Sequence, residues 1–400
     1  MKKRFVAFLM IGSIIFAALM PTAYGQNPSG SQSTPAYVVL SAESGQILKE
    51  NGSTAATNTS LLYRMMICFL VIENIETDMT ADIEGQPYTV PDLLKLSLLS
   101  DNQAATAALS NLLSPVPGSI IRMMNRRASE LGLTNTLFTV ADQVEAEYSH
   151  TTLQDVAKFI VAAVNNSEFK TLYCTQAAVL SADGTLINNN NKLVMAAGTS
   201  KNTGGTLGTY TQDTKNYSSV TYMGNITLAD SGSVTSMIFV CDCAEGMDYK
   251  LFGQRMLTEI GSHYSRVSIV TTGETLLTLP IGNETLNITA ASNTYCMKSA
   301  DIKNTVELIS FTMNEGHDIN DIEPPITKDS ELGVANILLY DGTTVKVPIV
   351  AGNSIYFQNE GFNTFFTSLI ANKQIMTLIV ILLVIELLLI LLKVKRRLGK

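Results

Sequence analysis

The chain has 400 residues, of which 46% are hydrophobic and 16% charged, and its formal net charge is −8. This excess of acidic residues excludes a nucleic-acid-binding role, because phosphate groups would be repelled. The five cysteines are odd in number and irregularly spaced, and no histidine lies at ligand spacing from them. A disulfide framework and a zinc site are therefore not expected, and neither is a cofactor.

The N-terminus has the pattern of a secretory signal. Lys2, Lys3 and Arg4 precede an apolar stretch, and Ala23-Tyr24-Gly25 supplies small residues for cleavage before the next residue. Residues 1–25 are therefore predicted to be a signal peptide. An uncleaved membrane anchor is the alternative, which the shortness of the apolar run disfavours.

The C-terminus has the pattern of a membrane span. Residues 374–392 are almost all Leu, Ile and Val, and their number matches the thickness of a bilayer core. The tail at 393–400 is basic, which marks the cytoplasmic side of a span. We therefore expect a single-pass protein of the cell membrane with the bulk of its chain extracytoplasmic.

Between these ends, the first part of the chain mixes strands with helices. Residues 26–35 are small, polar or Pro and predict a linker. The predicted strands are 36–40, 46–49, 220–228 and 234–241, and the predicted helices are 60–73, 91–99, 102–113, 119–131, 153–164 and 249–263. Strands, then helices, then strands and a closing helix predict an α/β (α+β) domain over 36–265.

The composition changes after residue 265. Short β-rich runs recur with turn residues between them, at 267–271, 275–279, 286–289, 306–312, 335–339 and 346–350. This pattern predicts a small all-β domain over 266–360. Residues 361–373 then form a second linker that leads to the span.

Several segments, in this order, resemble one known family. They are the opening Ala36–Leu48, the run LLKLSLLSDNQAATAA at 93–108, Met124–Ala128 with Leu131–Phe138, Thr151–Ala157, Asn189–Leu193 and Glu323–Ile326. The chain is similar to the low-molecular-mass penicillin-binding proteins that act as D-alanyl-D-alanine carboxypeptidases. The resemblance implies a DD-peptidase/β-lactamase-like fold and a peptidoglycan stem peptide as the ligand.

The chemistry that the resemblance implies needs three motifs. A serine at the start of a helix attacks the peptide carbonyl, and a neutral lysine one turn later accepts its proton. A Ser-x-Asn motif assists proton transfer and binds the substrate amide. A Lys-Thr-Gly motif on an edge strand recognises the terminal carboxylate and lines the oxyanion site.

The first motif is not intact in either of two registers. With Ser60 as the nucleophile, Tyr63 takes the place of the lysine. With Glu73 aligned to the end of the family's helix, Leu61 takes the place of the serine and Arg64 that of the lysine. Arginine does not deprotonate in proteins, and tyrosine would need a strongly depressed pKa. The alternative role for Ser60 is that of a helix N-cap.

The second motif is present as Ser100-Asp101-Asn102, between two predicted helices. Asn102 is expected either to bind substrate or to hold the loop between these helices. Sequence alone leaves both roles open.

The third motif is degenerate. The best-matching stretch is 205–211, in which Leu207, Gly208 and Thr209 replace Lys-Thr-Gly. A second stretch begins at Lys201 and has the required residues with one inserted. On a strand, such an insertion moves the side chains to opposite faces.

The loss of two motifs out of three favours a non-catalytic protein that binds peptidoglycan stem peptides or wall-synthesis proteins. Two alternatives stay open. One is an active or weakly active carboxypeptidase that uses Ser60 with Tyr63 or Lys201. The other is an extracytoplasmic scaffold for other wall enzymes.

Overall fold

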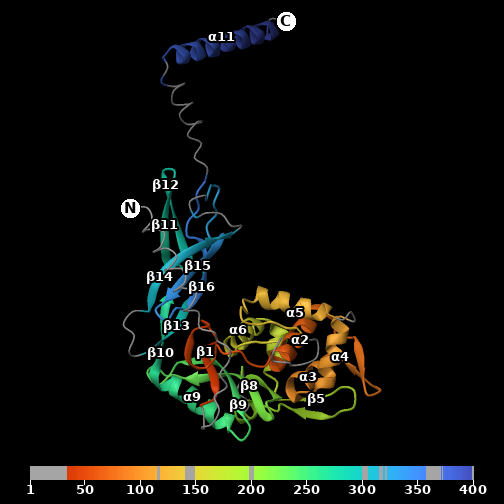
Figure 1. Ribbon diagram of the computed structural model, residues 1–400. Coiled ribbons are helices and arrows are strands. Elements are labelled where there is room, and N and C mark those ends of the chain that lie inside the picture. Colours follow the sequence, from red (N-terminus) through yellow and green to blue (C-terminus); the bar gives the residue numbers. More distant parts are fainter. Residues whose placement is uncertain are drawn as a thin grey trace, which may run out of the picture. The chain divides into compact units, whose positions relative to one another are not determined.

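The computed structural model describes residues 34–114, 118–139, 149–197, 202–299, 305–314, 319, 322–356, 371 and 373–398 (Figure 1). The predicted signal peptide lies outside these residues. The chain divides into two compact units. The first unit holds 1–271, 293–309 and 336–346, and the second holds 272–292, 310–335 and 347–400.

A five-stranded antiparallel sheet forms the centre of the first unit. Its strands are β1 (Ala36–Ser41), β2 (Ile47–Asn51), β7 (Gly204–Gln212), β8 (Lys215–Thr227) and β9 (Val234–Ala244). Their order is β2-β1-β9-β8-β7, so β7 lies at one edge with one side of its backbone unpaired by the sheet.

The sheet separates two hydrophobic cores. Along β1, Val38 and Leu40 face one core, while Tyr37 and Val39 face the other. This alternation follows from the two-residue period of a strand. A mixed α/β sandwich results, as the sequence predicted.

Helices cover both faces of this sheet (Figure 1). The first core is shared with α2 (Ser60–Asn74), α3 (Val90–Ser100), α4 (Gln103–Leu113), α5 (Ser119–Glu130), α6 (Leu153–Ala163) and α7 (Ser167–Tyr173). The second core is shared with α8 (Lys192–Ala196) and α9 (Tyr249–His263). Two small hairpins complete this part, formed by β3 (Thr80–Ile83) with β4 (Gln86–Thr89) and by β5 (Ala177–Val179) with β6 (Leu186–Asn188).

Helix α2 is buried on nearly all sides. Every residue from Leu61 to Val71 is buried except Tyr63. A helix that is apolar around its circumference belongs in a core. Arg64 is the one charged residue in this run, and its side chain is only 4% exposed.

The strands after α9 form two further sheets. β10 (Tyr264–Val270) pairs with β13 (Thr294–Ser299). The other strands are β11 (Thr275–Ile281), β12 (Glu284–Ala290), β14 (Val306–Met313), β15 (Glu331–Leu339) and β16 (Thr344–Ala351), in the order β11-β12-β16-β15-β14. All six β-rich runs predicted from the sequence overlap strands of the structure, whereas β13 was not predicted.

The last helix is α11 (Lys373–Leu398). It contains the predicted span, and the large apolar side chains described in it are exposed, for example Leu382 and Leu383. Among the residues described in full, no helix meets the length and apolarity required to cross a membrane.

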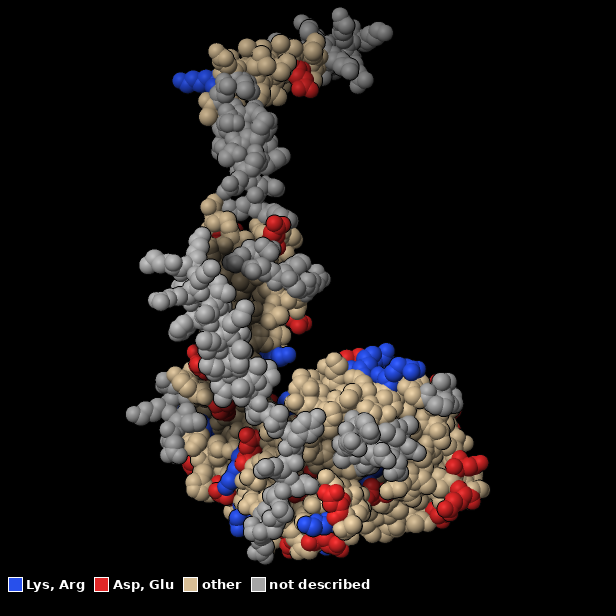
Figure 2. Space-filling view, viewed as in Figure 1, with Lys and Arg blue, Asp and Glu red and all other residues tan. Residues whose placement is uncertain are grey.

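Charged side chains are unevenly distributed on the face shown in Figure 2. Basic side chains gather over α5, which carries Arg122, Arg126 and Arg127. Arg127 forms ion pairs with Glu73 and Glu130. The basic charge of this region is therefore partly neutralised by neighbouring carboxylates.

An aromatic cluster holds α2 against α6 and α7. Phe69 packs edge-to-face on Phe159 and Phe169, with ring centroids 5.7 and 5.5 Å away. We predict that Phe69→Ala lowers the free energy of unfolding by about 3–5 kcal/mol, because it leaves a cavity in a closed core. Urea unfolding of the full chain measures this change.

Leu251→Ala is the matched control, because the Leu251 side chain is 65% exposed. It should change the free energy of unfolding by no more than about 0.5 kcal/mol. Equal effects of the two substitutions would contradict the packing described for α2.

Candidate functional site

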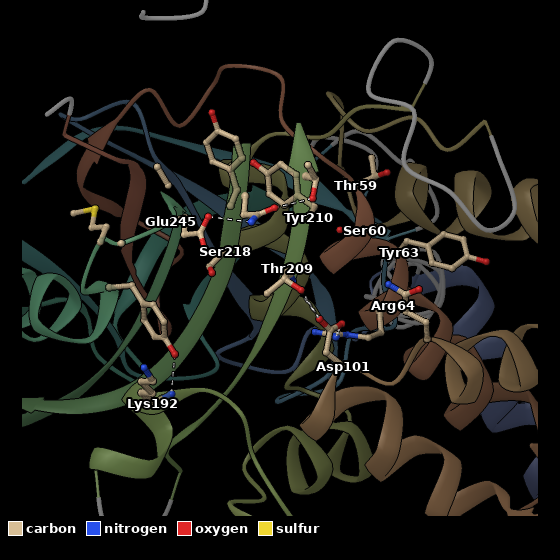
Figure 3. Close-up of a pocket in the computed structure, with 18 of the residues that line it drawn as sticks. Thr59, Ser60, Tyr63, Arg64, Asp101, Lys192, Thr209, Tyr210, Ser218 and Glu245 are labelled. Carbon is tan, nitrogen blue, oxygen red and sulfur yellow. Dashed lines mark hydrogen bonds and ion pairs between the residues drawn. The ribbon is translucent and has the colours of Figure 1, made fainter. Parts of the chain in front are cut away.

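A cavity of about 1270 Å³ opens along β7 (Figure 3). One wall comes from the start of α2 and from α4, with Thr59, Ser60, Tyr63, Arg64, Asp101, Gln103, Thr106 and Ala107. The other wall comes from Lys192, from Asn216–Ser218 of β8 and from residues 244–250. Thr209, Tyr210 and Thr211 of β7 also line the cavity.

Ser60 lies at the first position of α2 and lines this cavity. Its backbone N–H donates to Asn58 Oδ1 at 2.8 Å. Its Oγ is buried and has no hydrogen-bond partner among the described residues. The N-cap is Thr59, so the structure does not support the interpretation of Ser60 as a cap. Among the described residues, no base forms the hydrogen bond with Ser60 Oγ that would activate a nucleophile.

Tyr63 is directed toward α4 and not toward Ser60. Its hydroxyl lies 3.5 Å from Ser110 Oγ, and its ring packs edge-to-face on Phe138. Because Ser60 Oγ donates no hydrogen bond to any described residue, Tyr63 is not placed as the base of a serine–tyrosine pair.

Arg64 reaches from α2 to the edge of β7. Its Nη2 donates to Thr206 Oγ1 and to Leu207 O, both at 2.8 Å. Its Nη1 forms an ion pair with Asp101 Oδ1. Burial lowers the pKa of Arg64 to about 10, so the guanidinium still carries its proton at neutral pH.

Asp101 contacts both Arg64 and the edge of β7. It ends α3 in a left-handed conformation, with φ 58°. Its Oδ2 accepts from Thr209 N at 3.1 Å and lies 3.5 Å from Thr209 Oγ1 (Figure 3). Arg64 and Asp101 together therefore cover the outer backbone groups of β7 at Leu207 and Thr209.

The two outer residues of the second motif lie outside the cavity lining. Ser100 is exposed, and its Oγ donates back to Leu96 O at 2.7 Å. Asn102 is the N-cap of α4, and its Oδ1 accepts from Ala105 N at 2.9 Å. Of the two roles that the sequence left open for Asn102, the structure shows the local, structural one.

The third-motif residues lie on β7, but only Thr209 lines the cavity. Leu207 packs into the second core. A Cβ added at Gly208 would lie 3.3 Å from Leu61 Cδ1 and 3.6 Å from Arg64 Nη2, so glycine permits the close approach of α2. The structure therefore brings Leu61 and Arg64, not Ser60 and Tyr63, against the middle of β7. Lys201 lies outside the described residues.

Tyr210 stacks on Tyr217 at the far end of the cavity, with ring centroids 5.2 Å apart. Burial raises the pKa of Tyr210, and the nearby carboxyl of Asp242 raises it further. The phenol is therefore protonated at neutral pH and can donate a hydrogen bond, but it cannot act as a base.

The described residues contain no group of three His, Cys, Asp or Glu side chains arranged to hold a metal ion. The Sγ atoms of Cys241 and Cys243 lie 3.4 Å apart in the second core, on one face of β9. Both thiols are free, so they form no disulfide. The cavity offers hydroxyls, amides and backbone edge groups, which are groups that can form hydrogen bonds with a peptide backbone.

Sequence reasoning missed Asp101 because the motif directs attention to Ser100 and Asn102. One signal was available. Arg64 interrupts an apolar helix, and a buried guanidinium needs a carboxylate partner. Asp101 is the acidic residue of the second motif and was therefore the natural candidate.

Comparisons with known proteins agree with this architecture. The family model for D-alanyl-D-alanine carboxypeptidases matches residues 79–229. The match begins after α2, so Ser60 and Arg64 lie outside it. The D-alanyl-D-alanine carboxypeptidase DacF of Bacillus subtilis is 22% identical over 180 residues, which cover 39% of this chain and 46% of that protein. The match thus spans about half the length of this relative.

Solved structures share the fold. Penicillin binding protein 5 from Haemophilus influenzae is 16% identical, with a TM-score of 0.59, and the match covers 83% of this chain and all of that one. A peptidoglycan synthesis regulatory factor from Streptococcus pneumoniae has the same identity and TM-score, over 82% of this chain and all of that one. The chain is therefore similar to the D-alanyl-D-alanine carboxypeptidases over residues 79–229, and it shares the fold of these solved structures.

Proposed function

We propose that this chain is a non-catalytic member of its family that binds peptidoglycan stem peptides without forming an acyl-serine intermediate. One observation carries the proposal. Arg64, a buried guanidinium, contacts β7 where the resemblance would put a neutral lysine beside the edge strand. A group that keeps its proton cannot accept one from a serine.

The contact between α2 and β7 also supports the absence of a nucleophile. The residue of the first turn of α2 that approaches Gly208 is Leu61, which carries no nucleophilic atom. Ser60 has a hydroxyl, but no described residue bonds to it. Loss of a nucleophile together with its base costs many powers of ten in rate.

The features that would hold a peptide are retained. Beyond Thr209, the outer edge of β7 continues to Thr211 along the cavity. An unpaired strand edge binds an extended peptide by backbone hydrogen bonds, and side-chain pockets add selectivity. Stem peptides are the ligands that the family resemblance implies for such a groove.

The absence of acyl-serine chemistry is testable with a penicillin. We predict no covalent adduct on the full-length protein after prolonged incubation, measured by intact-mass spectrometry, because no described base contacts Ser60. A stoichiometric adduct that maps to Ser60 would instead establish an unorthodox active carboxypeptidase.

A repaired variant is the positive control. It combines Leu61→Ser and Arg64→Lys with Leu207→Lys, Gly208→Thr and Thr209→Gly. Shortening Leu61 makes room for the Cβ that the fourth substitution adds. An adduct on this variant shows that the cavity accepts the reagent.

The alternative register supplies a matched comparison. It keeps Ser60, introduces Tyr63→Lys and carries the same three strand substitutions. Tyr63 is directed toward α4, so we expect this variant to stay unreactive. Reactivity here, and not in the first variant, would reverse the register that we propose.

Binding is measured by co-sedimentation of the full-length protein with purified peptidoglycan. We predict retention that falls when Thr211→Pro removes an outer N–H from the strand edge. Val234→Ala is the control, because it changes an exposed side chain that does not line the cavity and that pairs with Thr227, at the other end of β8 from Asn216–Ser218. If peptidoglycan does not retain the unmodified protein, the binding proposal is contradicted and the scaffold for other wall enzymes remains.

We further propose that residues 374–392 anchor the protein in the cell membrane, with the larger part of the chain outside the cytoplasm. The support is their apolar sequence and the basic residues after it. We predict that the full chain stays with membranes after alkaline carbonate washing, whereas a chain ending at residue 372 is released. Release of the full chain would contradict the anchor.

A further inference from the structure

We propose that Arg64 and Thr209 form a carboxylate-binding site that the chain's own Asp101 occupies. The site is specific for a small carboxylate group, such as the C-terminal carboxylate of a bound peptide. This inference deepens the proposed function and rests on it for the identity of the ligand. The site itself can be tested independently.

The donors around Asp101 are those of a carboxylate receptor. A guanidinium from α2 pairs with Oδ1, and a backbone N–H of the β7 edge donates to Oδ2. The hydroxyl of Thr209 lies 3.5 Å from the same oxygen. Charge-assisted bonds from arginine, together with an edge N–H, are among the strongest means of binding a carboxylate in proteins.

The site faces the cavity and is not sealed inside the core. Arg64, Asp101 and Thr209 all line the cavity. The Asp101 side chain is 22% exposed, whereas that of Arg64 is 4% exposed. An incoming carboxylate could therefore reach the position of the Asp101 carboxylate, while the guanidinium stays fixed by Thr206 and Leu207.

The internal ligand fits its site incompletely. Asp101 has φ 58°, a left-handed conformation in which glycine is the usual residue at the end of a helix. The buried Nε of Arg64 has no hydrogen-bond partner among the described residues. A buried donor without a partner calls for an explanation, and a site built for a larger or differently placed anion supplies one.

β7 itself supplies no charged donor. Gly204–Gln212 contains neither Lys nor Arg. The positive charge beside the strand comes from α2 instead. A peptide carboxylate bound here would lie between Arg64 and Thr209, and it would displace the Asp101 side chain toward solvent.

Chemical rescue tests the site directly. Asp101→Gly removes the internal carboxylate and suits the left-handed backbone. We expect this full-length variant to be less thermostable than the unmodified protein. Sodium acetate, compared with sodium chloride at equal ionic strength, should raise its Tm by roughly 2–4 °C when acetate exceeds its Kd about ten-fold. The unmodified protein should show no such difference.

Two variants separate the site from general effects. Asp101→Asn keeps the volume and places a neutral amide in the site, so acetate should not stabilise it. The double substitution Arg64→Met with Asp101→Gly removes the guanidinium and should abolish the response. An equal response of all variants, or none in Asp101→Gly, would overturn the proposal. If Asp101→Gly folds only when acetate is present during expression, that dependence is itself the predicted rescue.

The ligand class is tested with N-acetyl-D-alanyl-D-alanine and its C-terminal amide by calorimetry. We expect Asp101→Gly to bind the acid at least ten-fold more tightly than the amide, and more tightly than the unmodified protein does. Acetate rescue without peptide binding would keep the site and reject the stem-peptide function. If peptidoglycan retains the protein but Asp101→Gly changes neither acetate stabilisation nor peptide binding, the proposed function stands and this site is rejected.

Discussion

A guanidinium buried in the second turn of an apolar helix requires a carboxylate, and Arg64 finds it in Asp101. Much of the site depends on this pair. It links α2 to the junction of α3 and α4, and it connects both to β7 through Leu207 and Thr209. An unpaired charge at this depth would cost about 3–5 kcal/mol. The pair is therefore a structural requirement of the fold, and the same contact occupies the space in which the family resemblance would put a serine and a lysine.

The proposed loss of chemistry and the persistence of the fold would have a common physical basis. A lysine that is held neutral contributes little to stability, whereas an arginine with three partners ties helix and strand together. Leu61 likewise replaces a polar group by one that packs against the backbone of Gly208. Both residues favour stability over reactivity, which agrees with the proposed non-catalytic function.

The sequence predicted most of the core elements but not all of the site. Ser60–Asn74 was predicted almost to its last residue because this largely apolar run, interrupted by Arg64, is too long for a typical strand. β7 was not predicted as an element in its own right, since its glycines and threonines carry no alternation. Asp101 was missed because its role depends on a contact between distant parts of the chain. Patterns along a sequence indicate which residues share a face, whereas ion pairs between elements need the third dimension.

The position of β7 at the edge of its sheet has a further consequence. A strand edge that binds peptides also invites pairing with the edge of another molecule, which is a common route to aggregation. Here the side chains of Arg64 and Asp101 occupy the outer bonding groups at Leu207 and Thr209, so a second strand cannot extend the sheet past them. These two residues thus limit self-association of an exposed edge, and they confine any strand that docks there to the stretch beyond Thr209.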